Sequence, residues 1–94
     1  LPSYAAPAGA GWVVGGGISS ARLKTLTGVE LARHSDAGEG GDLSEWVARR
    51  LTRPARGGDV VEDRGLRVIV RKTRYGRTSE AHVTALDNPA APKG

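Results

Sequence analysis

The stretch LRVIVRKTR, at residues 66–74, constrains the fold of this 94-residue chain more than any other segment. Apolar and polar residues alternate from Leu66 to Val70, a period typical of a β-strand with one face in the core and one toward solvent. Glycine-containing turn signals flank the stretch on both sides. They indicate tight turns to further strands over residues 59–62 and 78–86. The segment therefore predicts a three-stranded antiparallel meander.

The first half of the chain predicts one short strand and two short helices. The sequence GWVV at residues 11–14 is rich in β-forming residues and is followed by three glycines, which favours a strand. A short helix is expected after it, capped by Ser19 or Ser20 and ended at Gly28. The second helix is expected over residues 42–51, with Asp42 as its cap.

These elements predict one α+β domain: a small antiparallel sheet, made of the early strand and the meander, packed with two short helices. The domain is expected to span residues 11–86. Residues 1–10, rich in Ala, Pro and Gly, are predicted to be a linker, and residues 87–94 a C-terminal tail. The apolar periodicity predicts the following core residues: Trp12, Leu23, Leu26, Trp46, Val47, Leu51, Val68 and Val70.

Composition narrows the class of protein and leaves several partners open. The sequence has no cysteine, so neither disulfides nor thiolate metal ligands are expected. No run of apolar residues is long enough to cross a bilayer. The formal net charge of +4 is compatible with nucleic acid, anionic lipid or an acidic protein as partner.

Arginines on the polar positions of the meander form the strongest predicted binding surface. The residues are Arg67, Arg71, Arg74 and Arg77. A sheet that binds single-stranded nucleic acid would place aromatic residues among such cations to stack on bases, and only Tyr75 lies nearby. A surface that contacts a protein partner is therefore the preferred interpretation, with a nucleic-acid-binding module as the alternative. Carboxylates on neighbouring strands, such as Glu62 and Glu80, are available to neutralise part of the charge.

No pattern in the sequence indicates an enzyme. His34, Ser35 and Asp36 are the residue types of a hydrolytic triad, but consecutive residues cannot converge on one reacting atom. The same segment, residues 32–41, is predicted to be an exposed loop.

Two further segments could bind small ligands. Asp36, Glu39 and Asp42 offer carboxylate oxygens at intervals of three residues, which could hold Mg²⁺ or Ca²⁺. The glycines at residues 15–17, between a strand and a helix, could present backbone amides to the phosphates of an adenine or flavin nucleotide. Neither spacing matches an established ion or nucleotide motif, so Asp42 as a helix cap and the glycines as a turn are the competing interpretations.

The linear order of motifs resembles the CorC/HlyC-type transporter-associated domain. The chain carries an early GWVVG strand and a short helix with paired leucines, Leu23 and Leu26. A helix rich in apolar residues follows, and then Gly58-Asp59 with the GLR triplet at residues 65–67. The resemblance covers residues 11–86. The chain departs from the family pattern at the start of the second helix, where it has Asp42, Ser44 and Glu45 instead of Thr and glycines.

The resemblance implies a regulatory domain on the cytoplasmic side of the cell membrane. Family members usually follow a membrane domain and paired CBS domains in magnesium/cobalt efflux or hemolysin-like proteins. The family fold resembles part of an FAD-binding domain, so a flavin nucleotide is suggested as a cofactor only by analogy of fold. The expected function is modulation of ion transport by a non-enzymatic module, through contacts with the CBS and membrane domains of the same polypeptide or within a homodimer.

Overall fold

The computed structural model describes residues 1–35 and 41–86 of the chain. Its elements, in chain order, are β1 (Ala5–Ala8), β2 (Gly11–Gly15), α1 (Ser20–Thr27), the 3-10 helix η1 (Leu31–His34), α2 (Leu43–Ala48), β3 (Val60–Asp63), β4 (Leu66–Arg74) and β5 (Arg77–Ala85). The predicted α+β class is confirmed.

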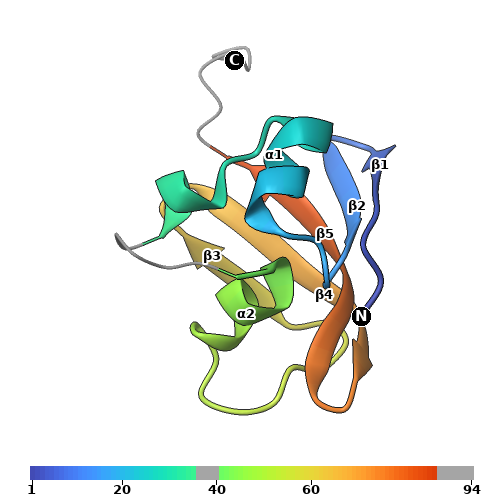
Figure 1. The fold of residues 1–94 in the computed structure, drawn as a ribbon. Helices are drawn as coiled ribbons and strands as arrows, with labels where there is room; N and C mark the ends of the chain where they lie inside the picture. Colours follow the sequence, from blue (N-terminus) through green and yellow to red (C-terminus); the bar gives the residue numbers. More distant parts are fainter. Residues whose placement is uncertain (36–40, 87–94) are drawn as a thin grey trace.

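The five strands form one antiparallel sheet in the order β1-β2-β5-β4-β3 (Figure 1). Strands β3, β4 and β5 are the predicted meander, and β2 pairs with β5 at its side. The helices α1, η1 and α2 all lie over one face of this sheet (Figure 1). Within the described part of the chain, no helix lies over the opposite face, which we call the open face.

The prediction of a linker over residues 1–10 is wrong for its second half, because Ala5–Ala8 form the edge strand β1. β1 pairs with β2 in a register that sets Ala5 opposite Val14 and Ala8 opposite Gly11. Pro7 is compatible with this position, since an edge strand can spare the N–H that proline lacks. Small, mostly exposed side chains give such a strand no apolar alternation, and the sequence pattern therefore missed it.

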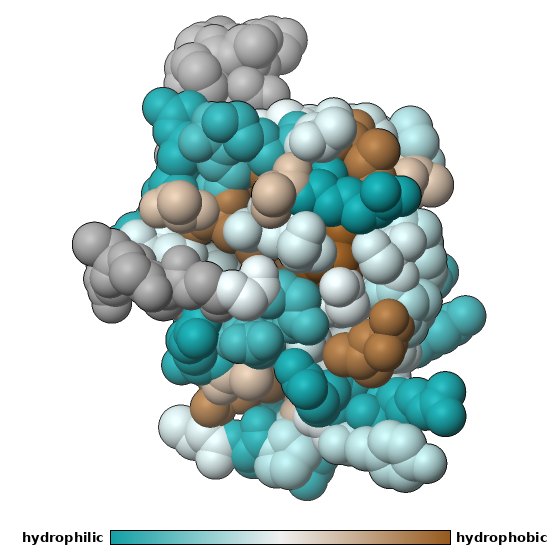
Figure 2. Space-filling view, viewed as in Figure 1, coloured by the Kyte–Doolittle hydropathy of each residue, from teal (hydrophilic) through white to brown (hydrophobic). Residues whose placement is uncertain are grey.

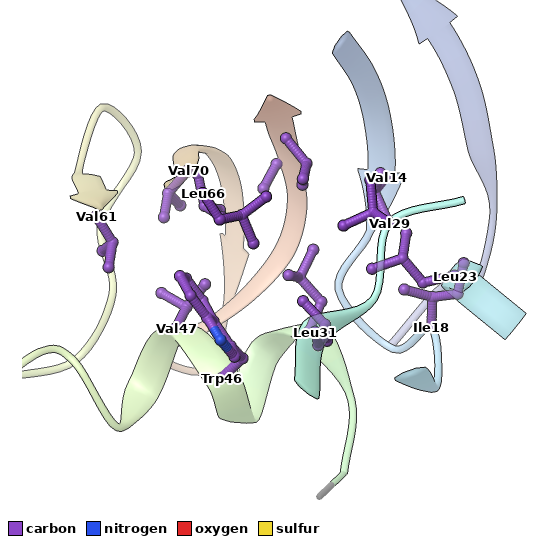
Figure 3. Packing of buried hydrophobic residues seen from close by; sticks show 14 residues of the cluster. Val14, Ile18, Leu23, Val29, Leu31, Trp46, Val47, Val61, Leu66 and Val70 are labelled. Carbon is purple, nitrogen blue, oxygen red and sulfur yellow. The ribbon is translucent and has the colours of Figure 1, made fainter. Parts of the chain in front are cut away.

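The core lies between the three helices and the covered face of the sheet. Figure 3 shows side chains of α2 and η1 directed toward those of the strands. Figure 2, which views the helical side, shows a mostly hydrophilic surface with scattered apolar residues over this core. The buried cluster consists of Val14, Ile18, Leu23, Val29, Leu31, Leu43, Trp46, Val47, Val61, Leu66, Val68, Val70, Ala81 and Val83.

Most of the predicted core residues are confirmed, with three differences. Leu26 is 41% exposed, so its assignment to the core is wrong. Ile18 and Val29, which flank α1, pack with Leu23 in the buried cluster (Figure 3). Trp12 and Leu51 are partly buried and pack against the cluster from its margin.

Both helices begin at the predicted caps. The Ser19 hydroxyl accepts from the amide of Arg22, 3.1 Å away, and a carboxylate oxygen of Asp42 accepts from the amide of Glu45 at 2.9 Å. α1 ends at Gly28, whose φ of 79° lies in the left-handed region that favours glycine. α2 is shorter than predicted, because the amides of Arg50 and Leu51 bond three residues back instead of four.

The loop expected over residues 32–41 is partly helical. η1 covers Leu31–His34, and both Leu31 and His34 are buried. The Nδ1 atom of His34 lies 2.7 Å from the carbonyl oxygen of Arg64, and the His34 carbonyl accepts from the indole N–H of Trp46 at 3.1 Å. These bonds fix the 3-10 turn between α2 and the β3–β4 turn, so this part of the predicted exposed loop is wrong.

Candidate functional site

The arginine surface predicted from the sequence is internally paired over its first half. The Nε atom of Arg67 donates to Glu62 at 2.8 Å, and that of Arg71 donates to Glu80 at 2.9 Å. These pairs join neighbouring strands on the open face, as the cross-strand register allows. Their charges are therefore largely neutralised within the chain.

The other two arginines have different surroundings. Arg77 donates to the hydroxyl oxygen of Ser44 at 2.8 Å and lies 3.8 Å from a carboxylate oxygen of Asp42, so it ties β5 to the start of α2. Arg74 is exposed, and its guanidinium carbon lies 5.5 Å from the centre of the Tyr75 ring. The four arginines thus do not form one continuous basic surface. Arg67 and Arg71 are paired on the open face, Arg77 contacts the start of α2, and Arg74 lies beside Tyr75.

Of the three residues proposed to hold a cation, only Asp42 lies in the described part of the chain. Asp36 and Glu39 fall outside it. One oxygen of Asp42 accepts from both the Glu45 amide and the Ser44 hydroxyl, as expected of a helix cap. Across residues 1–35 and 41–86, no group of three or more potential metal-ligating side chains comes together.

The glycine segment at residues 15–17 cannot offer its amides to a phosphate in this structure. The Gly15 amide donates to the carbonyl of Tyr4 at 2.9 Å, that of Gly16 to Ser79 at 2.9 Å, and that of Gly17 to Pro2 at 2.8 Å. A Cβ atom on Gly16 would lie 1.7 Å from the Thr78 carbonyl oxygen. These glycines permit close packing of backbone segments. This agrees with the interpretation of the segment as a turn and argues against a site for the phosphates of a nucleotide.

A row of side chains crosses the open face on all five strands. The register sets Ala6 opposite Val13, Val13 opposite His82, His82 opposite Ile69, and Ile69 opposite Val60. We call these five residues the open-face row. Val13, His82 and Ile69 are half-buried, whereas Ala6 and Val60 are exposed. All but one of them are apolar.

His82 lies at the centre of this row and is held by neighbours on both sides. Its Nε2 atom donates to the carbonyl of Ala8, 2.8 Å away, and its Nδ1 atom lies 3.3 Å from the hydroxyl oxygen of Thr84. The ring reaches over Gly11, where an added Cβ would lie 3.0 Å from the imidazole carbon Cε1. The histidine therefore cross-links β5 to β1 across β2.

A polar cluster borders the row on the side of residues 4 and 80. Glu80 accepts from the Tyr4 hydroxyl and from Arg71. The hydrogen bond from Tyr4 is the largest cause that lowers the pKa of Glu80. Burial, followed by this hydrogen bond, raises the pKa of Tyr4 to about 12. The cluster is thus an anionic carboxylate neutralised by Arg71 and capped by a protonated tyrosine.

A separate cleft of about 410 Å³ lies between α1, η1 and the strand ends. Trp12, Gly28, Arg33 and His34 are among its lining residues. Sequence reasoning did not predict it, because the lining comes from segments distant in the chain. None of the residues singled out from the sequence for ligand or partner binding lines it.

No model of a known protein family matches this chain, and no curated protein matches its sequence. The fold is similar to that in the crystal structure of a functionally unknown conserved protein from Haemophilus influenzae Rd KW20. The TM-score is 0.73 at 16% sequence identity, and the alignment covers 89% of this chain and 100% of the other. At this identity the similarity shows the fold alone.

Proposed function

We propose that this chain is a non-enzymatic regulatory domain that acts by docking through the open face of its sheet. The setting implied by the sequence resemblance is an integral membrane ion transporter of the magnesium/cobalt efflux or hemolysin-like class. The docking partners in that setting are the CBS and membrane domains of the same polypeptide, or a second copy of the chain. The domain would lie on the cytoplasmic side of the cell membrane.

The observation that carries the proposal is the open-face row. It runs across the whole sheet, it is apolar except at His82, and in the described residues no helix covers it. Two cations that flank the row on β4, Arg67 and Arg71, are each paired with a carboxylate of the same chain. An apolar strip between neutralised polar flanks suits a protein partner, since protein interfaces are depleted of unpaired charge at their centre.

The same pairing weakens the nucleic-acid alternative for this face. Phosphate contacts require cations that are free to replace counterions, and Arg67 and Arg71 already bond to Glu62 and Glu80. The hydroxyl of Tyr4, the aromatic residue beside the row, donates a hydrogen bond to Glu80 and is therefore not available to a nucleic acid. We therefore retain protein docking as the function of the open face.

Docking can regulate transport only if the partner binds this face better in one transporter state than in the other. The open-face row can supply that difference in binding if the partner covers it in only one state. Burying its half-exposed valine and isoleucine side chains is favourable by roughly 25 cal/mol for each Å² of apolar area removed from water. In the described residues, β1–β5 form a single hydrogen-bonded sheet, so the face would dock as a rigid surface.

Ile69→Glu tests the proposal, because it places a charge in the middle of the row without entering the covered core. The first measurement is sedimentation velocity of the chain over a range of concentrations, which reports self-association. The second is divalent-cation efflux by the complete polypeptide in cells. Arg22→Glu, at an exposed position on α1, is the control for a glutamate placed away from the row, and it changes the net charge by −2 where Ile69→Glu changes it by −1.

We expect Ile69→Glu to weaken association or alter efflux while the circular dichroism spectrum stays native. Arg22→Glu should change neither property. If both variants behave like the unmodified chain in both assays, the open face is not a docking surface and the proposal is wrong. If the Ile69→Glu chain is unfolded, Ile69→Thr is the milder substitution, since threonine keeps the β-branched shape while removing apolar area.

A further inference from the structure

The turn between β4 and β5 holds an aromatic residue in a conformation that costs stability. Tyr75 has a φ of 53°, in the left-handed region that favours glycine, and its side chain is 91% exposed. The guanidinium carbon of Arg74 lies 5.5 Å from the centre of its ring. A strained aromatic side chain with almost no packing inside the chain points to a contact outside it.

The segment before β3 lies against this turn. The amide of Ala55 donates to the carbonyl of Gly76 at 2.9 Å, and the amide of Gly58 donates to that of Val70 at 2.7 Å. Figure 1 shows the β4–β5 turn and this segment together at the bottom of the molecule. Figure 2 shows that most of the visible surface at this end is hydrophilic.

Basic residues gather here in excess of acidic ones. Three of them have carboxylate partners, namely Arg53 with Asp59, Arg71 with Glu80 and Arg77 with Asp42. Three others are exposed, and the structure records no ion pair within 4 Å between them and a carboxylate of the described residues: Arg56, Lys72 and Arg74. At longer range, and after the side-chain hydrogen bonds that are the largest causes, Arg56 lowers the pKa of Asp59 and Lys72 lowers that of Glu80, so both carboxylates offset part of this charge. We call these three cations, together with Tyr75, the hairpin-tip surface.

We propose that the hairpin-tip surface binds the anionic headgroups of a phospholipid bilayer. Cations near an anionic leaflet are attracted to its negative surface potential, and each strengthens binding about fivefold. Tyrosine is enriched at the headgroup level of membranes, because its ring is apolar and its hydroxyl is polar. An exposed tyrosine in a turn that also carries exposed cations fits such a surface.

Single-stranded nucleic acid fits this end of the molecule less well. Proteins that bind it combine a basic groove with several aromatic side chains on which successive bases stack. Here Tyr75 is the one aromatic residue of the tip, and it projects from a turn. The large cleft is lined instead by residues of α1, η1 and the strand ends.

Membrane binding goes beyond the proposed function and does not depend on it. Docking uses the open-face row, whereas the lipid contact uses the end of the sheet where β4 and β5 turn. A variant of one surface should leave the other unchanged. The two proposals can therefore fail separately.

The test is co-sedimentation of the 94-residue chain with vesicles of phosphatidylcholine that contain phosphatidylglycerol, at low and at high salt. Pure phosphatidylcholine vesicles are the lipid control. We expect binding to the anionic vesicles only, and a loss of that binding at high salt. Lys72→Gln with Arg74→Gln should weaken it about 25-fold, at roughly fivefold for each cation.

Arg22→Gln with Arg33→Gln is the matched control, since it removes the same charge from exposed sites on α1 and η1. It should bind almost like the unmodified chain. Equal weakening by both double variants, or no binding to anionic vesicles at low salt, would overturn the proposal. Binding to a single-stranded oligonucleotide without binding to the vesicles would overturn it in favour of nucleic acid. Thermal unfolding of each variant verifies that the fold is retained.

Discussion

Asp59 shows how one residue fixes the path into the sheet. Its carboxylate takes a two-pronged contact from Arg53, with Nη2 at 2.6 Å and Nη1 at 3.0 Å, and also accepts from the amide of Arg56 at 2.8 Å. The side-chain bond from Arg53, followed by the backbone bond from Arg56, lowers the pKa of Asp59 from 3.8 to about 2. The Gly-Asp pair noted in the sequence is thus a structural turn that stabilises the ionised carboxylate.

This pKa predicts a specific dependence of stability on pH. Because the folded value lies below the unfolded one, the contribution of Asp59 is fully present above about pH 4 and is lost as the pH falls toward 2. Asp59→Asn should lower the free energy of unfolding near neutral pH and flatten its decline over that interval. Urea unfolding at several pH values measures both effects. An unchanged acid slope in the variant would show that other carboxylates cause the decline.

Tyr75 predicts the opposite effect, a gain in stability on substitution. The two-residue turn at Tyr75 and Gly76 has positive φ at both positions, the conformation in which Asn-Gly is preferred. Tyr75→Asn should therefore raise the free energy of unfolding by about 1 kcal/mol, since a side chain such as tyrosine is strained there. The same variant should bind anionic vesicles less well. A loss of stability would show that the tyrosine ring packs usefully in the folded chain.

At the level of elements, local chemistry made the predictions that succeeded. Cap residues, glycine at the end of α1 and turn dipeptides act within a few residues, and the structure confirms them at Ser19, Asp42, Gly28 and the two hairpins. The errors concern elements whose existence depends on distant partners. β1 has little apolar side chain of its own and is held by β2, and η1 is fixed by bonds to Arg64 and Trp46.

The role of Asp42 can be tested at the level of its helix. As a cap, Asp42 should tolerate Asn, which keeps an acceptor oxygen, whereas Asp42→Ala should cost about 1 kcal/mol. Neither substitution should change how the melting temperature responds to Mg²⁺ or Ca²⁺. Thermal unfolding with and without each cation makes the comparison. A cation-induced rise that disappears in Asp42→Asn would restore the predicted metal site.

For the whole molecule, the candidate surfaces follow from strand register, which no single segment encodes. The sequence predicted the covered and open sides of β4, and burial along that strand confirms them. It did not predict that Val13, His82 and Ile69 align, because two pairings across three strands bring these residues together. Likewise, Arg56 joins the tip only because its segment bonds back onto the hairpin. The sequence gives the type of each residue, but only the folded structure shows which residues lie together on the open face and at the hairpin tip.

The last prediction concerns β1 and the completeness of the sheet. Deletion of residues 1–8 would remove the carbonyl oxygens of Pro2 and Tyr4 that accept from the amides of Gly17 and Gly15. It would also leave the edge of β2 unpaired, and an open edge can pair with another chain. At about 1 kcal/mol for each net hydrogen bond, we expect a loss of at least roughly 2 kcal/mol, together with increased aggregation. Thermal unfolding and light scattering measure the two effects. Deletion of residues 87–94, predicted from the sequence to be a tail, is the control and should be nearly neutral. If both deletions are equally tolerated, residues 1–8 are a linker after all, and β2 serves as the edge of a four-stranded sheet.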